Sequence, residues 1–266
     1  VPEHKARNQP PVNKGPQGNS CTRTQPEPAT AQKQPGKCLT DRKHQHIDHH
    51  RVDEHEPKTT QNAHSGLPCI SPMPLSGRLY LLFTPELCRH DPFETLNSAL
   101  AAGVDLVQWR SKKQDRQGFE RTRVICRKHK VPLLVNDNVM LALRSEAAGA
   151  HVGQDDMPLD AARKLMFGRL FGVSTHDVAQ IEAAMKSRAN YIGFGPCYPS
   201  TTRGNDEGIG MEEVAAAVLK CNELDLPMFA IGGITPKNLP GLYAQGVRRV
   251  AVSSYVLQHT NPAQAV

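Results

Sequence analysis

Three polar side chains follow one another at two-residue intervals: Gln108, Arg110 and Lys112. In a β-strand, residues two apart point to the same face, so Gln108 and Arg110 would project together. A carboxamide, a guanidinium and an ammonium group suit a polar heterocycle and a phosphate. The alternative interpretation is a charged surface loop that binds nothing.

Carboxylates follow the next two short apolar runs. Asn136 and Asp137 end one run, and Asp155 and Asp156 come after the other. Mg²⁺ favours a few carboxylates together with substrate phosphate oxygens. We therefore predict that Asp137 and Asp156 share one magnesium ion. The alternative is that Asp155 or Asp156 caps the helix expected after Pro158.

Hydroxyl groups and glycines follow the later runs. Ser174 ends one run, and residues 200–203 read Ser-Thr-Thr-Arg, so that hydroxyls precede a cation and form a plausible phosphate clamp. Gly232 and Gly233 would let backbone N–H groups approach a phosphate, and Ser253 lies at the end of the next run. These features predict a site for phosphorylated small molecules.

Short runs rich in β-forming residues must position these groups. Segments with helix-like apolar spacing separate them, as at 93–102, 119–128 and 211–221. Alternating strands and helices indicate a parallel sheet, and eight strands indicate a closed (β/α)8 TIM barrel, in which chemistry lies at the carboxyl ends of the strands. An open doubly wound sheet is the alternative. A last helix is expected to start at Asn261–Pro262. The predicted strands are 79–83, 106–110, 132–137, 150–153, 170–175, 191–195, 228–233 and 249–254.

Residues 1–77 differ from the rest of the chain. They contain no Phe, Trp or Tyr but 11 of the 21 prolines and 7 of the 12 histidines. Burial of so few large apolar side chains cannot offset the conformational entropy lost when the segment becomes ordered. We therefore predict a disordered tail at 1–77 and a barrel at 78–266. The His-rich stretch at 44–55 is interpreted as solvated rather than as a metal site, because it has no fixed flanking structure.

Charge and cysteine content narrow the class of protein. The net charge of +6 includes no dense basic run, so nucleic acid is not an expected partner. Seven cysteines without CxxC spacing, no long apolar run and no signal-peptide pattern predict a reduced, cytoplasmic protein without membrane spans. Cys197 is interpreted as a packing residue, and His176 as more often structural than catalytic. Homo-oligomer formation is left open.

At six places in order, the chain resembles the thiamine phosphate synthases. The resemblance extends over essentially all of 79–266. It rests on Val-Gln-Trp-Arg-Ser-Lys at 107–112, Leu-Val-Asn-Asp at 134–137, His-Val-Gly-Gln-Asp-Asp at 151–156, Gly-Val-Ser-Thr-His at 172–176, Tyr-Ile-Gly-Phe-Gly-Pro at 191–196 and Ala-Ile-Gly-Gly-Ile at 230–234.

The resemblance implies a reaction and a role for each candidate residue. The substrates would be 4-amino-5-hydroxymethyl-2-methylpyrimidine diphosphate and 4-methyl-5-(2-hydroxyethyl)thiazole phosphate, joined after diphosphate departs in a dissociative, Mg²⁺-assisted step. By this resemblance, Gln108 would bind the aminopyrimidine, the diphosphate would be held by Arg110, Lys112 and Asn136, and Mg²⁺ would be bound by Asp137 and Asp156. Ser174 would contact the diphosphate or the carbocation region. The loop that closes over the substrates would carry Ser200, Thr202 and Arg203, and the thiazole phosphate would be bound by Gly232, Val252 and Ser253.

The chain departs from the family pattern at four positions. The clamp usually reads Thr-x-Thr-Lys but has Ser200 at its first position, which keeps the hydroxyl, and Arg203 at its last, which keeps the charge. The usually acidic position after Arg110 is Ser111, and Trp109 is unusually large, although it should point away from Gln108. Two alternatives remain: a relative similar to thiazole tautomerases, and a non-catalytic sensor of thiamine intermediates. Retention of the predicted diphosphate and metal residues argues against the tautomerase.

Overall fold

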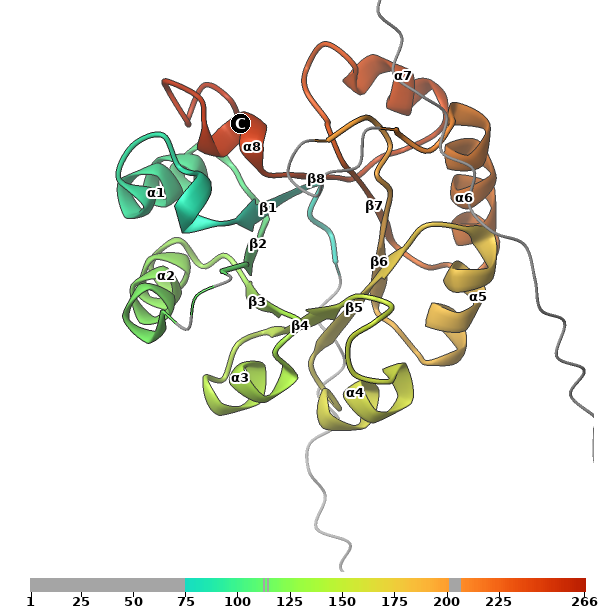
Figure 1. Cartoon of the computed structure of the whole chain (residues 1–266), viewed down its shortest axis with the longest axis horizontal. Helices are drawn as coiled ribbons and strands as arrows, with labels where there is room; N and C mark the ends of the chain where they lie inside the picture. Colours follow the sequence, from blue (N-terminus) through green and yellow to red (C-terminus); the bar gives the residue numbers. More distant parts are fainter. Residues whose placement is uncertain (1–74, 112, 114, 201–206) are drawn as a thin grey trace, which may run out of the picture. The chain divides into compact units, whose positions relative to one another are not determined.

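Eight parallel strands close into a barrel in the computed structural model of the chain, with the helices outside the ring of strands (Figure 1). The structure describes residues 75–111, 113, 115–200 and 207–266. The predicted disordered tail therefore lies, up to residue 74, outside the described residues. The strands are β1 Leu79–Phe83, β2 Leu106–Trp109, β3 Leu133–Asn136, β4 Gly149–Val152, β5 Leu170–Thr175, β6 Tyr191–Phe194, β7 Met228–Ile231 and β8 Val250–Val252.

Each strand pairs with its neighbour in sequence, and β1 also pairs with β8. Leu79 lies opposite Val250 and Leu81 opposite Val252, which closes the ring. The TIM barrel prediction is thus confirmed and the open doubly wound sheet is wrong. The predicted strand at 249–254 is shorter than expected, because Ser254 already begins a helix.

The helices follow the strands in alternation, and short polar side chains start four of them. Asp91 accepts hydrogen bonds from the N–H groups of the first turn of α1, and Asp115, Asn138 and Asp177 do the same for α2, α3 and α5. None of the helices in the described part of the chain combines the length and apolar character that a membrane span needs. The helical segments are η1 Pro85–Leu87, α1 Pro92–Ala102, α2 Arg116–His129, α3 Val139–Arg144, α4 Leu159–Leu165, α5 Val178–Lys186, α6 Met211–Glu223, α7 Leu239–Ala244 and α8 Ser254–Leu257.

The expected helix at Asn261–Pro262 is wrong. The last helix, α8, lies earlier in the chain, and Asn261 starts a turn instead. Both the backbone carbonyl and the side-chain oxygen of Asn261 accept from the N–H of Gln264, at 3.1 and 3.3 Å. An asparagine side chain that accepts a hydrogen bond from a backbone N–H a few residues later stabilises a turn as readily as a helix start. The sequence at this position is therefore compatible with both.

The core has two layers, because alternate strand residues face opposite sides of the barrel wall. Tyr80, Leu106, Leu134 and Tyr191 belong to the layer inside the barrel. The residues between them pack outward against the helices. Trp109 is in the outer layer, in contact with the rings of Phe83 and Phe119, so it points away from Gln108 as predicted. The same alternation sends Gln108 and its equivalents on other strands into the barrel.

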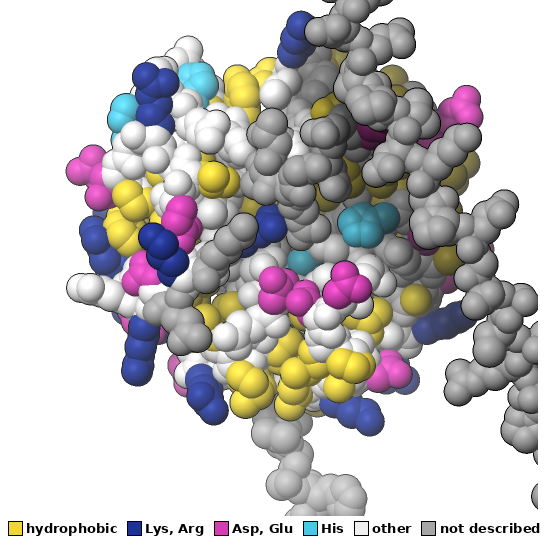
Figure 2. Space-filling view, in the orientation of Figure 1, with side chains coloured by type: hydrophobic (Ala, Val, Ile, Leu, Met, Phe, Trp, Pro, Cys, Tyr) yellow, Lys and Arg dark blue, Asp and Glu magenta, His cyan; other side chains and the backbone are white. Residues whose placement is uncertain are grey.

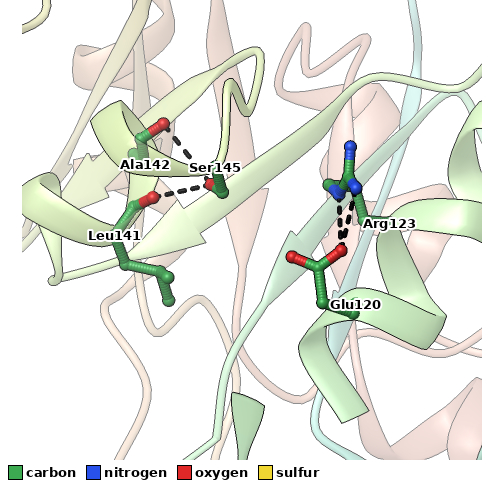
Figure 3. A network of polar contacts seen from close by, with 5 residues as sticks. All are labelled: Glu120, Arg123, Leu141, Ala142 and Ser145. Atoms are coloured by element: carbon green, nitrogen blue, oxygen red, sulfur yellow. Dashed lines mark hydrogen bonds and ion pairs between the residues drawn. The ribbon is translucent and has the colours of Figure 1, made fainter. Parts of the chain in front are cut away.

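Short-range polar contacts stabilise the outer helices locally. On α2, Arg123 forms an ion pair with Glu120 at 2.8 Å, and at the end of α3 the Ser145 hydroxyl donates to the carbonyl of Leu141 at 2.6 Å (Figure 3). Such an exposed i,i+3 pair contributes only about 0.3–0.5 kcal/mol. The ion pair adds little to stability, so burial of the two core layers holds the barrel together.

Gly172 makes room for Tyr191 inside the barrel, and this gives a prediction about stability. A Cβ at position 172 would collide with the Tyr191 ring. We expect Gly172→Ala to lower the free energy of unfolding by about 1–3 kcal/mol, the usual cost of overpacking. Urea unfolding followed by circular dichroism measures this. The control Ala101→Ser, at an exposed position of α1, should change it by less than about 0.5 kcal/mol, and an equally small effect of Gly172→Ala would contradict the packing.

Candidate functional site

A cavity of about 550 Å³ opens where the chain leaves β5, β6, β7 and β8. In parallel barrels this end of the strands carries the site, because the loops there vary without disturbing the wall. Seen along the direction of Figure 1, basic, acidic and histidine side chains gather near the centre of the face (Figure 2). Of the residues singled out by sequence, the cavity is lined by Arg110, Ser174, His176, Ser200, Gly232, Val252 and Ser253.

A smaller cavity of about 20 Å³ lies inside the ring of strands, and several of its lining residues also line the larger cavity. Gln108, Arg110, Asn136 and Ser174 all line it. Gln108 is only 2% exposed, at an inward position of β2. The structure therefore brings four predicted residues from three strands, β2, β3 and β5, to the floor of the site.

Arg110 follows β2 directly and is held there by its backbone. Its N–H donates to the carbonyl of Phe83 at 2.9 Å, which continues the β1–β2 ladder by one residue. Of the two described members of the predicted set, Gln108 lines the smaller cavity and Arg110 lines both. Lys112 lies outside the described residues.

Asp137 occupies a constrained position at the end of β3. Its φ is +58°, a left-handed conformation that Asp and Asn tolerate better than most residues. Its backbone N–H donates to the carbonyl of His151 on β4 at 2.8 Å, and one carboxylate oxygen accepts from the Asn136 amide at 2.5 Å. The backbone and a neighbouring amide thus fix where this carboxylate lies.

Asp156 turns back onto the end of β4 rather than capping a helix. Its carboxylate accepts from the N–H of Gly153 at 2.6 Å. Helix α4 begins after Pro158 and has no side-chain cap, so the prediction that Asp155 or Asp156 caps it is wrong. Asp156 thus closes a short loop back to Gly153, and the residue is exposed at the end of β4.

The predicted magnesium pair consists of two exposed carboxylates on neighbouring strands. Asn136 of β3 lies opposite His151 of β4, so the loops that carry Asp137 and Asp156 are adjacent. Within residues 75–266, apart from those not described, no three His, Cys, Asp or Glu side chains form a metal cluster. Two carboxylates alone fit Mg²⁺ better than a transition metal, because Mg²⁺ completes its octahedron with water and phosphate oxygens.

Sequence reasoning missed His151, which is buried inside the barrel. One ring nitrogen lies 3.0 Å from the Tyr191 hydroxyl and the other 3.0 Å from the Ser174 hydroxyl. Its position on β4 is the signal that could have found it, since it is a polar, inward-facing residue like Gln108 and Ser174. Tyr80 and Tyr191, which join His151 to Gln108, gave no such signal because tyrosine is common in cores.

The two glycines after β7 serve the packing of a neighbouring loop. Gly232 and Gly233 both adopt positive φ, +99° and +59°. A Cβ on Gly232 would lie 2.5 Å from the Cβ of Pro196, and one on Gly233 would collide with the carbonyl of Pro199. The glycines thus let the loop after β6 pack against β7, and they line the cavity at the same time.

Ser253 ties the end of β8 to β1. Its hydroxyl donates to the carbonyl of Leu82 at 3.0 Å. A donor already engaged with a carbonyl leaves only lone pairs for other partners. The Ser253 hydroxyl therefore presents an acceptor to the cavity, and any donation to a phosphate at this place would come from other groups. Val252 also lines the cavity, while its half-buried side chain packs against the outer core layer.

The loop after β6 is held on both sides. His176 contacts the carbonyl of Gly195 through Nδ1, and the Tyr198 hydroxyl donates to the carbonyl of Asn238 at 2.8 Å. These contacts bring Ser200 to the edge of the cavity. The other predicted clamp residues, Thr202 and Arg203, lie outside the described residues. His176 makes its contact with the Gly195 backbone and also lines the cavity, so its structural role stays a prediction.

Cys197 beside the cavity should be a slow thiol. It is 2% exposed and burial raises its pKa to about 11. At pH 8 we expect iodoacetamide to label it at least about 100-fold more slowly than in urea, because the thiolate is the reactive form and burial limits access. Mass spectrometry of the labelled peptides measures this, and a cysteine introduced at exposed Ala101 should be labelled at the normal rate. Equal rates at the two positions would contradict the packing role.

Comparison with known proteins places this geometry in a family. A sequence model described as thiamine monophosphate synthase matches residues 79–256. A thiamine-phosphate synthase of Prochlorococcus marinus (strain MIT 9313) is 39% identical over 183 residues, which are 67% of this chain and 51% of that relative. One of Mycolicibacterium smegmatis is 36% identical over 201 residues, 70% of this chain and 88% of that relative. The chain spans about half the length of the first of these relatives.

Solved structures agree on the fold. The thiamine phosphate pyrophosphorylase from Pyrococcus furiosus superposes with a TM-score of 0.63 at 27% identity, over 71% of this chain and 91% of that one. A 3-hexulose-6-phosphate synthase superposes with a TM-score of 0.54 at 13% identity, over 71% of this chain and 95% of that one. The second likeness concerns the barrel alone.

Proposed function

The chain belongs to the thiamine monophosphate synthase family, and from this membership we propose that it is a transferase that makes thiamine phosphate. It would condense 4-amino-5-hydroxymethyl-2-methylpyrimidine diphosphate with 4-methyl-5-(2-hydroxyethyl)thiazole phosphate and release diphosphate. The observation that carries the proposal is the gathering of Gln108, Arg110, Asn136 and Ser174 around two cavities that share lining residues.

The arrangement of these residues supports a separate part of the site for each of the two substrates. Gln108 on the floor would bind the aminopyrimidine, with Arg110, Lys112 and Asn136 around its diphosphate. The wall formed by Gly232, Val252 and Ser253 would bind the thiazole phosphate, with backbone N–H groups as donors because the Ser253 hydroxyl already donates to Leu82. The clamp residues Ser200, Thr202 and Arg203 would close over both. A cavity of about 550 Å³ has the size usual for small-molecule sites.

The proposed reaction needs no protein nucleophile. The C–O bond to the diphosphate breaks first and the electron pair leaves with the diphosphate, while the aminopyrimidine stabilises the positive methylene carbon. The thiazole nitrogen then donates its lone pair to that carbon. Arg110 would neutralise the departing charge and Ser174 would donate a hydrogen bond near it, while the walls hold the second substrate in place.

We propose Mg²⁺ as the cofactor, with Asp137 and Asp156 as its protein ligands. When bound, it would supply positive charge to the diphosphate oxygens. The support is the donor set: two exposed carboxylates on adjacent strand ends, one of them fixed by the Asn136 amide. The tautomerase alternative is disfavoured because a tautomerase would not need this pair.

One assay tests the proposed function directly. Purified protein incubated with both substrates and Mg²⁺ should produce thiamine phosphate and diphosphate, detected by liquid chromatography, and EDTA should stop the reaction. Substrate binding without product would instead favour the sensor. Product formation that EDTA leaves unchanged would remove the magnesium proposal but keep the transferase. A cytoplasmic location remains a prediction from the cysteine content.

A further inference from the structure

Five side chains from five strands form one unbroken line of hydrogen bonds through the barrel. The Gln108 amide donates to the Tyr80 hydroxyl at 2.6 Å, and the hydroxyls of Tyr80 and Tyr191 are 3.0 Å apart. Tyr191 lies 3.0 Å from His151 Nδ1, and His151 Nε2 lies 3.0 Å from the Ser174 hydroxyl. Both ends, Gln108 and Ser174, line the same cavity.

Four of the five members are buried. Gln108, Tyr80 and Tyr191 are each 2% exposed or less, and His151 is 7% exposed. Burial raises the pKa of both tyrosines, so each keeps its proton and has one hydrogen to donate. In a buried line of this kind, the direction of one bond constrains the direction of the next.

Counting hydrogens from Gln108 gives the direction of the whole line. Tyr80 accepts from the Gln108 amide, and the Tyr191 oxygen is the acceptor left among its two hydroxyl partners, so we assign the Tyr80 hydrogen to Tyr191. Tyr191 then donates to Nδ1 of His151, which must be unprotonated to accept. The proton of the neutral ring therefore lies on Nε2 and is donated to Ser174. Because Ser174 accepts from inside the barrel, its own hydrogen is left for the cavity.

We propose that this line is a positioning device that holds the Ser174 hydroxyl as a hydrogen-bond donor toward the substrate. This inference rests on the proposed function, since the anion it serves is the departing diphosphate. If the line ran in the reverse direction, the Ser174 hydroxyl would donate its hydrogen to His151 and would present only a lone pair to the anion. Tyr80, Tyr191 and His151 act through Ser174 and are positioning residues rather than catalytic ones.

The glycines around the line support a built arrangement. A Cβ at Gly172 would occupy the Tyr191 ring, and one at Gly193 would lie 3.4 Å from Cε1 of His151. Both glycines sit on inward positions of neighbouring strands, β5 and β6, paired with Tyr191 and Ser174 in the register. The wall of the barrel thus leaves the space in which the two rings hold their orientation.

The state of the His151 ring tests the direction without any substitution. Nitrogen-15 NMR of the side chain in the full chain should find His151 neutral, with the proton on Nε2 and none on Nδ1. A ring protonated on Nδ1 would overturn the proposal. This measurement needs neither substrate nor activity, so it separates the hydrogen-bond line from the proposed function.

Tyr191→Phe tests the consequence, because it removes the hydrogen that selects the tautomer. We expect His151 to populate the Nδ1-protonated form and kcat for coupling to fall about tenfold, the size of one hydrogen bond to a charged group, with KM for the thiazole phosphate unchanged. The control Tyr243→Phe, at an exposed tyrosine of α7, should change neither quantity. Tyr80→Phe is a milder second variant if Tyr191→Phe does not fold.

A double-substitution cycle shows whether the effect passes through Ser174. Affinity for inorganic diphosphate, measured by calorimetry, should fall in Tyr191→Phe and in Ser174→Ala, and Tyr191→Phe should add little in the Ser174→Ala background. Fully additive losses would overturn the positioning role. Diphosphate binding that follows this pattern in a chain without coupling activity would reject the proposed function and keep the positioning device.

Discussion

Asp137→Asn is expected to lower kcat/KM for coupling by roughly 10³-fold or more, about 4 kcal/mol in the barrier. Asparagine keeps the left-handed backbone that Asp137 adopts at φ +58° and can still accept from Asn136. The substitution therefore removes charge while leaving the local fold in place. The loss would come from weaker binding of Mg²⁺ and less neutralisation of the diphosphate.

The measurement is steady-state coupling over a range of Mg²⁺ concentrations. Asp137→Asn should need more Mg²⁺ for half-maximal rate, and Asp137→Ala should be as inactive but also less stable because of its strained backbone. The matched control Asp155→Asn removes a neighbouring exposed carboxylate to which no role is given, and its rate should stay within about twofold. A variant as active as the unchanged chain would reject Asp137 as a ligand, and would be the result expected of a tautomerase.

Arg110→Ala is expected to lower kcat by about 10²–10³-fold, the usual effect of removing one preorganised group that stabilises developing charge. Arg110 is the described cation that reaches both the floor and the main cavity. Arg110→Lys should recover only part of the rate, because an ammonium keeps the charge but lacks the planar pair of donors that matches a phosphate.

Pre-steady-state rates of diphosphate release distinguish this role from simple binding. A loss in that step with little change in KM for the thiazole phosphate would support Arg110 at the leaving group. Arg127→Ala, at an exposed position in the last turn of α2, is the matched control and should leave the rate unchanged. Equal losses in the two variants would point to a general effect of net charge rather than to a site.

Much of the fold could be predicted from local patterns. The eight strands lie where runs of β-forming residues were found, within about two residues at most ends, because strand formation depends on a short stretch of chain. The predictions fail where a polar side chain can form either a helix cap or a turn. Asp156 bonds Gly153 instead of capping α4, and Asn261 forms a turn instead of a helix. A side chain that can bond to either neighbouring backbone does not fix its partner in advance.

The site could be predicted in part. Arg110, Ser174, Gly232 and Ser253 line the main cavity because each ends a strand or follows one, and those ends meet at the same edge of a barrel. The direction of the Ser253 hydroxyl could not be predicted, since its partner is the carbonyl of Leu82, 171 residues away in sequence. The resemblance to a family supplied roles, but not these contacts.

The order of the elements follows from alternating strand-like and helix-like patterns in the chain, and the residues that face inward follow from a period of two along each strand. The sequence by itself did not determine which inward residues meet. Tyr80 and Tyr191 are separated by 111 positions and come together only when β1 closes on β8 and the interior fills. Contacts across a barrel depend on its closure and on the stagger of its strands, which are properties of the whole ring. The buried line from Gln108 to Ser174 is therefore a product of the tertiary structure.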